Sequence, residues 1–344
     1  RHPRSVGRQR HVRGSTEGET TGACLQQRKR FGHTRIVPHT VGGYPPCMSI
    51  QSDRRILLVH AHPDDETIGS GVTMAKYVKD GAHVALVTCT LGEEGEVLVA
   101  DLAHLGVNGE DRLGDHRINE LGDAMKHLGV TDWQLLGEPG KYRDSGMMGE
   151  SSNNREGCFW QTDLLKAAED LVPVIREQRP HVLITYDDFG GYGHPDHIQA
   201  HRTAMYASQL AAAPTFRPDL GQAWDVPKIY WTAISKSMIR AGIEALRASG
   251  DTSEMAMMDP DEIQFGVDDA LVTTKIDGRE FLPQKIAAMR AFPTQINMES
   301  GFFSFAELPD SPMGIEHFRL IKGRLGDLDD SGHETDLFAG LTTR

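Results

Sequence analysis

Apolar and polar residues follow two periods that alternate along the chain. Short apolar runs with few charges are typical of buried strands. Five such runs follow one another, at 56–60, 83–90, 133–136, 181–186 and 228–235. Between them, apolar residues recur every three to four positions, which is typical of amphipathic helices. These helical stretches lie at 67–81, 116–129, 163–178 and 197–213. Strands alternating with helices predict a parallel sheet covered on both faces.

The pattern weakens after about residue 250. It still predicts one strand at 270–278 and one helix at 279–292. The acidic stretch GDLDDSGHETD, residues 326–336, is expected to be a solvated end because it offers little apolar surface to bury.

These elements predict an α/β fold with a Rossmann-like, mostly parallel sheet. We expect the core domain to span residues 48–250, and residues 251–344 to form a smaller C-terminal α+β part that completes the substrate cleft. The connections at 91–115 and 138–160 are longer than usual between strand and helix, and such loops often carry function.

Residues 1–47 lack both periods and differ in charge from the rest. They carry nine Lys and Arg against two acids, whereas the remainder carries 27 against 47. We expect a disordered leader without a secretory apolar run. Met48 is the more economical natural start, and a genuine flexible arm is the alternative. The acidic body argues against a nucleic-acid partner, since phosphate backbones require a basic surface.

Cysteine usage and hydropathy indicate the compartment. Cys24, Cys47, Cys89 and Cys158 show neither a CxxC pair nor a disulfide-framework spacing, which predicts free thiols in a reducing cytoplasm. No apolar run approaches the roughly 20 residues of a membrane span. We therefore expect no membrane partner, and the sequence leaves the oligomeric state open.

One short motif occurs twice. HPDD at 62–65 and HPDH at 194–197 each follow a strand-like run, the second after the loop DDFGGYG. The carboxyl ends of parallel strands share one edge of a sheet, so loops far apart in sequence can meet there. The repetition predicts two halves of one site.

The residue types in the two motifs suit a catalytic metal. Neutral imidazoles and a carboxylate are preferred ligands of catalytic zinc, with a fourth position left to water. We expect His62, Asp65 and His197 to be the ligands, although such a site could also hold Fe(II) or Mn(II). Pro63 would stiffen the turn, and Asp64 would be free to accept a proton from the attacking water.

Each motif alone has a plainer interpretation. Pro and Asp suit turns, and Asp caps helices, so a single HPDD or HPDH is more often a turn before a helix. Two such motifs after buried strands favour the metal site. His60 is expected to be a core histidine, and His127, His181 and His201 are interpreted as structural or surface residues.

At these motifs the chain resembles the LmbE-like, PIG-L-type family of zinc N-deacetylases, whose motifs are AHPDDE, here 61–66, and HPDH. The similarity runs from about Arg55 to near Gly340. TCTLGEEGEV, RDSGM, GGYGHPDH and ETDLFAGL are similar to the actinobacterial branch that deacetylates N-acetylglucosaminyl-inositol in mycothiol biosynthesis. The resemblance implies a cytoplasmic hydrolase with one zinc ion per chain and this small pseudodisaccharide as substrate.

The resemblance also implies roles for residues whose type alone says little. His194 corresponds to a general acid, with Asp196 as the carboxylate that supports its charge. Tyr192 corresponds to a residue that polarises the amide carbonyl. The predicted substrate-binding residues lie on the two long loops or at the helix beside them: Glu96, Arg117, Asp144 and Met147. Without the resemblance, the glutamates of GEEGE would equally be a solvated acidic loop.

The nearest alternative is the sister enzyme of this family, the mycothiol S-conjugate amidase. Its second motif has proline where this chain has Gly193, and it carries a lysine just after its AHPDDE motif, where this chain reads Thr67, Ile68 and Gly69. Both differences favour the deacetylase.

Two further classes are less consistent with the sequence. A sugar-binding protein with a structural metal would not need a spare carboxylate such as Asp64, because structural zinc is usually closed by four ligands. A nucleotide-binding protein would carry G-x-G-x-x-G after the first strand, and GSGVT at 69–73 does not replace it.

Overall fold

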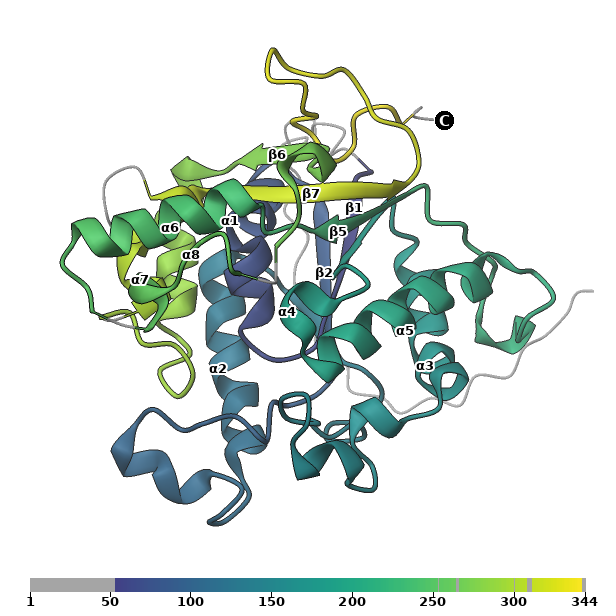
Figure 1. The fold of residues 1–344 in the computed structure, drawn as a ribbon. Coiled ribbons are helices and arrows are strands. Elements are labelled where there is room, and N and C mark those ends of the chain that lie inside the picture. Colours follow the sequence, from purple (N-terminus) through teal and green to yellow (C-terminus); the bar gives the residue numbers. More distant parts are fainter. Residues whose placement is uncertain (1–52, 253, 264–265, 300, 308–310, 342–344) are drawn as a thin grey trace, which may run out of the picture. The chain divides into compact units, whose positions relative to one another are not determined.

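The computed structural model describes residues 53–341 apart from 253, 264–265, 300 and 308–310. These residues belong to one compact unit (Figure 1). The predictions for the leader, Met48, Cys24 and Cys47 lie outside the described residues. No described helix has the length and apolar character needed to cross a membrane.

A seven-stranded mixed sheet forms the centre of this unit. Its strands are β1 (Arg55–His60), β2 (His83–Thr88), β3 (Asp132–Leu135), β4 (Val182–Thr185), β5 (Lys228–Thr232), β6 (Thr274–Asp277) and β7 (Ile315–Lys322). Their spatial order is β3-β2-β1-β4-β5-β7-β6. The first five strands are parallel, whereas β7 runs antiparallel to both β5 and β6. The predicted Rossmann-like, mostly parallel sheet is confirmed.

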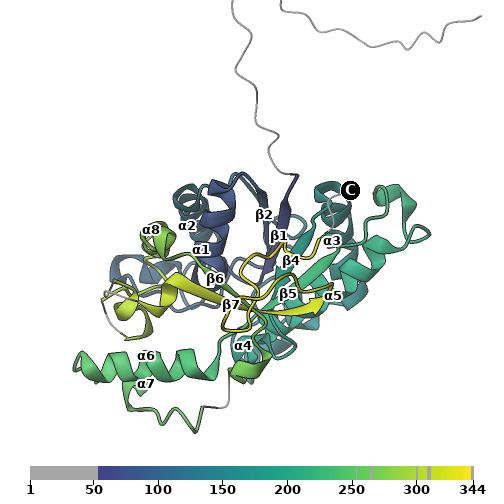
Figure 2. The same ribbon diagram turned by 90° about the horizontal axis from the view of Figure 1, so that it is seen from above.

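Helices cover both faces of the sheet. They are α1 (Asp65–Lys79), α2 (Leu113–Leu128), α3 (Leu164–Gln178), α4 (Gly190–Gly193), α5 (Pro195–Ala212), α6 (Lys236–Ala248), α7 (Glu254–Met257) and α8 (Leu282–Met289). Short 3₁₀ turns lie at 100–105, 151–154, 159–161, 218–220, 269–271, 279–281, 301–307 and 312–314. Figure 2 shows α1, α2 and α8 on one side of the sheet and α3 and α5 on the other.

The alternation of side chains along β1 explains the two apolar cores. Ile56 and Leu58 point into the core that contains residues of α1, α2 and α8. Leu57 and Val59 point into the core formed with α3 and α5. All four are almost fully buried, which is why β1 is a continuous apolar run rather than an alternating one.

The predicted strands and helices up to residue 235 are present, each end within three residues of its prediction. The C-terminal region differs more: α6 and β7 were not predicted, and the strand expected at 270–278 is limited to β6. The expectation of a solvated acidic tail is wrong at Glu334, which is fully buried. Its carboxylate is paired with the buried Lys228 ammonium, Oε1 to Nζ 2.7 Å, a contact that no local pattern reveals.

Candidate active site

The two HPD motifs follow the two strands between which the topology of the sheet reverses. β1 pairs with β2 on one side and with β4 on the other. Open α/β sheets leave a crevice at such a switch point, beyond the carboxyl ends of the strands. The turn after β1 carries residues 62–65, and the loop after β4 leads into 194–197 at the start of α5. The fold therefore brings together the two halves expected from the sequence.

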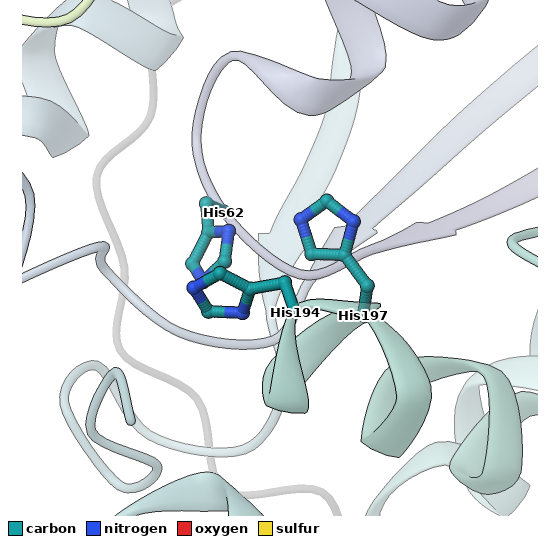
Figure 3. A group of neighbouring side chains, drawn as sticks. All are labelled: His62, His194 and His197. Atoms are coloured by element: carbon teal, nitrogen blue, oxygen red, sulfur yellow. The ribbon is translucent and has the colours of Figure 1, made fainter. Parts of the chain in front are cut away.

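Three buried imidazoles meet in this crevice (Figure 3). His62 reaches in from the β1 loop, while His194 and His197 come from the start of α5. The ring centroid of His62 lies 4.6 Å from that of His194 and 5.2 Å from that of His197. One nitrogen from each ring lies within 4.8 Å of the other two.

Asp65 lies between two of these rings. Its Oδ2 is 3.2 Å from His62 Nδ1 and its Oδ1 is 3.3 Å from His197 Nε2. The Tyr186 hydroxyl donates to Oδ2 at 2.8 Å and fixes the carboxylate. Burial alone would raise the pKa of Asp65, but the His197 and His62 imidazoles outweigh it and hold this pKa well below its usual range. Asp65 is therefore an ionised carboxylate.

His197 has one nitrogen occupied and one open. Its Nδ1 lies 3.1 Å from the Gly190 carbonyl oxygen, to which it can donate. Its buried Nε2 has no hydrogen-bond partner in the described part of the chain. A hydrogen bond at one imidazole nitrogen fixes the tautomer that leaves the other as a metal-ligating lone pair. The open Nε2 beside Asp65 therefore fits a metal ligand.

His62 is held from its far side by carboxylates. Its Nε2 lies 3.3 Å from Asp196 Oδ2 and 3.5 Å from Asp144 Oδ1. Ser145 fixes Asp196 in turn, through its backbone N–H at 2.8 Å and through its hydroxyl. A carboxylate on the second imidazole nitrogen is the usual support of a metal-ligating histidine. The Nδ1 of His62 thus faces Asp65, on the ligand side.

Two groups of described side chains have metal-ligand spacing; both contain His62, and neither contains the predicted ligand Asp65. One adds His194 and His197, and the other adds Asp144 and Asp196. His194 Nδ1 already accepts the Asp196 backbone N–H at 3.1 Å. The Asp196 carboxylate accepts the Ser145 backbone N–H, and the Asp144 carboxylate accepts the Gly146 backbone N–H. The set of His62, Asp65 and His197 leaves the His197 Nε2 open and stays a prediction.

Asp64 lies next to this set with its carboxylate bound to Arg117. Arg117 Nη2 donates to Asp64 Oδ2 at 2.8 Å. Burial raises the pKa of Asp64 to about 6, although the Arg117 guanidinium opposes the rise. A carboxyl with this pKa is mostly ionised near neutral pH and can still accept a proton.

His194 differs from the expectation about its charge. Asp196 was expected to keep this ring protonated, but the Asp196 carboxylate faces His62 and Ser145 instead. Burial, together with the neighbouring His62 and His197, lowers the pKa of His194 to about 3. With Nδ1 accepting from the Asp196 backbone, the neutral ring carries its proton on Nε2. His194 is therefore a neutral hydrogen-bond donor.

The predicted substrate-binding residues separate into a buried and an exposed pair. Arg117 and Asp144 are buried, and they contact Asp64 and His62 respectively. Glu96 and Met147 are exposed at the ends of the long loops. Tyr192 is also exposed, to 44%, and its ring centroid lies 4.9 Å from that of His197.

Several residues that shape the site were missed by sequence reasoning. Glu93 accepts the Asp144 backbone N–H at 2.9 Å, and Glu94 accepts from Arg143 at 2.9 Å. Both lie in GEEGE, where a solvated loop was an equal alternative. Tyr186 and Ser145 also escaped notice. Burial of an acid or a hydroxyl in a loop is set by tertiary contacts, so no local pattern indicated them.

A cavity of about 160 Å³ opens beside the imidazoles. Asp65, Tyr192 and His197 line one end, and apolar residues such as Met238 and Ile315 line much of the remainder. His60 also lines it; the expected core position is confirmed, since the residue is 1% exposed. Neither of its ring nitrogens has a hydrogen-bond partner within the described residues.

Comparison with known proteins identifies related sequences. The family model of GlcNAc-PI de-N-acetylases, PIG-L, matches residues 57–208. The 1D-myo-inositol 2-acetamido-2-deoxy-alpha-D-glucopyranoside deacetylase 1 of Catenulispora acidiphila is 55% identical over 302 residues, covering 87% of this chain and 93% of that protein. Deacetylases of the same name, without the number, are each 54% identical in Geodermatophilus obscurus (84% and 98% covered) and Kribbella flavida (86% and 100%).

Two solved structures share the fold at low identity. N,N'-diacetylchitobiose deacetylase from Pyrococcus horikoshii aligns with a TM-score of 0.53 and 18% identity, covering 79% of this chain and 85% of that one. GalB, the 4-carboxy-2-hydroxymuconate hydratase of Pseudomonas putida, aligns with a TM-score of 0.54 and 16% identity, covering 80% and 98%. A deacetylase and a hydratase on one fold mean that the reaction has to be argued from the site.

Proposed function

Because this chain belongs to the PIG-L family of de-N-acetylases, we propose that it hydrolyses the acetamide of 1D-myo-inositol 2-acetamido-2-deoxy-α-D-glucopyranoside. The products are acetate and glucosaminyl-inositol, a step of mycothiol biosynthesis. The observation that carries this substrate is the identity above 50% to curated deacetylases of that name over nearly their whole length. The chain is thus an amide-cleaving hydrolase, and its partner is a small pseudodisaccharide.

The proposed metal is one zinc ion per chain, held by His62, Asp65 and His197. The open Nε2 of His197 and the ionised Asp65 beside it support this assignment. Two imidazoles and one carboxylate leave a position for water or substrate, as catalytic zinc sites do. When bound, the metal supplies a nucleophile usable near neutral pH and polarises the amide carbonyl.

Asp64 is the proposed general base. Its carboxylate lies beside the ligand set, and its pKa of about 6 suits the uptake of a proton from the attacking water at neutral pH. Asp64 would then carry that proton while the tetrahedral intermediate exists. The amide nitrogen has to receive a proton before the carbon–nitrogen bond breaks.

His194 and Tyr192 are the proposed hydrogen-bond donors to the substrate. A neutral His194 can donate from Nε2 to the developing oxyanion or to the departing amine. Because the pKa of about 3 disfavours a second proton on this ring, His194 donates a hydrogen bond only, and the proton that the departing amine receives would come from the protonated Asp64. The Tyr192 hydroxyl would add a donor from the rim.

The two long loops are proposed to bind the sugar and inositol. Asp144 and Glu96 offer acceptors for hydroxyl groups, whose directions a polyol presents in a fixed pattern. Met147, exposed next to them, offers an apolar contact. Arg117 is part of the same proposal, although its guanidinium contacts Asp64 rather than open space. We place the reaction in the cytoplasm, which the unpaired thiols of Cys89 and Cys158 support.

The decisive experiment is acetate release by zinc-loaded protein from N-acetylglucosaminyl-inositol, run beside a mycothiol S-conjugate. We expect preference for the first substrate, loss of turnover on chelation and recovery when zinc is restored. Recovery of turnover with Fe(II) but not with zinc would change the proposed metal and would not affect the proposed substrate.

A mycothiol S-conjugate amidase is the second candidate, because the cavity beside the site has room for an acyl group larger than acetyl. Preference for the S-conjugate would establish that activity instead. Turnover of neither substrate by the zinc-loaded protein would contradict both candidates.

A further inference from the structure

Asp64 has a backbone conformation that aspartate rarely adopts, with φ 123° and ψ −34°. In this region the Cβ of an L-residue is crowded by its own backbone, so the conformation persists only where the surroundings hold it. Asp64 directly precedes α1, and aspartate at that position is a strong helix cap. Its carboxylate nevertheless caps no N–H group of α1. Some other contacts therefore keep it turned toward the site.

The first contact is made by Arg117. This side chain is only 3% exposed, and its Nη2 donates both to Asp64 Oδ2, at 2.8 Å, and to the Pro63 carbonyl oxygen. Its Nη1 donates to the Gly92 carbonyl oxygen at 2.9 Å. One guanidinium thus binds the carboxylate and the backbone of the HPD turn and ties both to the next loop.

The second contact is made by Glu66. This side chain is fully buried; its Oε2 accepts the Asp64 backbone N–H at 3.0 Å and its Oε1 accepts the Thr67 hydroxyl at 2.7 Å. A glutamate at the second helical position that accepts the N–H of the N-cap residue is similar to half of a capping box, in which the acid lies at the third position. Such a glutamate is normally exposed. Burying it costs far more than capping requires, so its place indicates a need for a fixed Asp64 backbone.

We propose that Arg117 and Glu66 are positioning residues that hold Asp64 toward the reacting amide, Arg117 through the carboxylate and Glu66 through the backbone N–H. The inference rests on the proposed role of Asp64 as general base. It also gives Arg117 a task other than binding a substrate hydroxyl. Without the two contacts, the Asp64 backbone would relax and its carboxylate would turn to the free N–H groups of α1.

Gly92 provides an independent approach to the same contact. Its φ is +66°, and a Cβ at this position would lie 1.8 Å from Arg117 Nη1. Gly92→Ala should therefore displace the guanidinium without changing any charge. It should reproduce the effect of Arg117→Met on turnover, to a smaller extent.

The test is a double-mutant cycle on the zinc-loaded enzyme. Arg117→Met should lower kcat by about 100-fold and change KM less than threefold, and Arg117→Lys should recover part of the loss. In the Asp64→Asn background, Arg117→Met should change kcat less than threefold further, because both substitutions remove the same function. The backbone contact is tested with two substitutions of Glu66. Glu66→Met should lower kcat strongly, whereas Glu66→Gln keeps one acceptor oxygen and should lower kcat little. Arg240→Met, at an exposed position of α6, is the matched control and should behave as wild type.

A crystal structure of Arg117→Met gives a readout that does not depend on the substrate. We expect Asp64 to leave φ near 123° and its carboxylate to approach the N–H groups of α1. An unchanged Asp64 conformation in both Arg117→Met and Glu66→Met would overturn the proposal. A tenfold rise in KM at unchanged kcat in Arg117→Met would also overturn it, and so would additive effects on kcat in the double-mutant cycle. Failure of the wild-type enzyme to release acetate would instead contradict the proposed function, while the crystal structures still decide the positioning.

Discussion

His62 and His197 present different nitrogens to the site, and each is held by its other nitrogen in a different way. His62 offers Nδ1 while carboxylates face its Nε2. His197 offers Nε2 while its Nδ1 lies against a backbone carbonyl oxygen. A carboxylate partner makes an imidazole more basic than a carbonyl does. We therefore expect the two proposed ligands to contribute unequally to metal binding.

We predict that His197→Ala lowers zinc affinity by at least about tenfold, because loss of a residue that hydrogen-bonds to a metal ligand alone costs about 10–100-fold and loss of the ligand itself costs no less. The measurement is zinc content after dialysis against a weak chelator, together with a competition titration. His104→Ala, on an exposed turn, is the control. Full zinc occupancy in His197→Ala would place the third ligand elsewhere.

Asp64→Asn should show the opposite behaviour. We expect zinc content to stay at the wild-type level, because no proposed ligand is lost, while kcat falls by about 10²–10⁴-fold through loss of the general base. Metal analysis and acetate release on the same sample test both parts. Near-normal turnover would remove Asp64 from the mechanism.

The residue types of the site could be predicted from the sequence, but their contacts could not. The repeated HPD motif indicated His62, Asp65 and His197 because residue type and position after a strand are local properties. The contact between Arg117 and Asp64 spans 53 positions, and the one between Ser145 and Asp196 spans 51. Such pairs depend on where loops from different strands meet, which no local period encodes. The charge expected for His194 was wrong for the same reason.

At the scale of elements, the short helix α4 and the start of α5 position His197. Gly190 has φ +68° and its carbonyl oxygen lies 3.1 Å from His197 Nδ1. A Cβ on Gly190 would lie 2.7 Å from the His197 Cβ. A Cβ on the next residue, Gly191, with φ +77°, would meet nothing within 4 Å among the described residues. The two glycines thus share the backbone requirement and differ in crowding.

This pair allows strain to be separated from crowding. We predict that Gly191→Ala destabilises the protein by about 1–3 kcal/mol, the cost of placing a residue with a Cβ at φ +77°, ψ −57°, and leaves zinc affinity unchanged. Gly190→Ala should cost more stability and also weaken zinc binding, because His197 has to move. Urea denaturation and zinc titration of both variants measure these effects. Equal zinc affinity in both would show that crowding at His197 is relieved without moving its ligand atom.

The elements themselves were predictable where one period dominates. The strands and helices up to β5 are long, apolar or amphipathic runs, and their order alone predicted the parallel sheet. β7 was missed because its sequence IEHFRLIK mixes charged and apolar residues, and its burial is mostly partial. Such an antiparallel strand is identified only by its pairing with β5 and β6. β7 begins 83 positions after the end of β5 and 38 positions after the end of β6.

At the scale of the whole molecule, one buried polar network joins the C-terminal segment to the sheet. The Glu334 carboxylate accepts hydrogen bonds from Lys228 Nζ at 2.7 Å, from the Tyr230 hydroxyl and from the Thr274 hydroxyl at 3.0 Å. Lys228 begins β5, so the network lies at the end of the sheet opposite the site. The network therefore stabilises the fold and takes no part in the reaction.

We predict that Glu334→Ala lowers the free energy of unfolding by about 3–5 kcal/mol, because it leaves the Lys228 ammonium buried without its partner. The kcat of the remaining folded protein should be unchanged. Asp330→Ala, at an exposed position of the same segment, should change stability by less than about 0.5 kcal/mol. Chemical denaturation monitored beside acetate release tests this, and equal stability of the two variants would show that the network contributes nothing.

The late position of β7 in the chain also affects folding during translation. A ribosome completes every residue assigned to the site by position 197, whereas β5 ends at 232 and its partner β7 begins only at 315. At 5–20 residues per second, the nascent chain waits roughly 4–17 s with the edge of β5 unpaired. Open strand edges are templates for association with other chains. During translation, the newly formed half of the protein therefore depends on β7, or on a chaperone, to cover this strand edge.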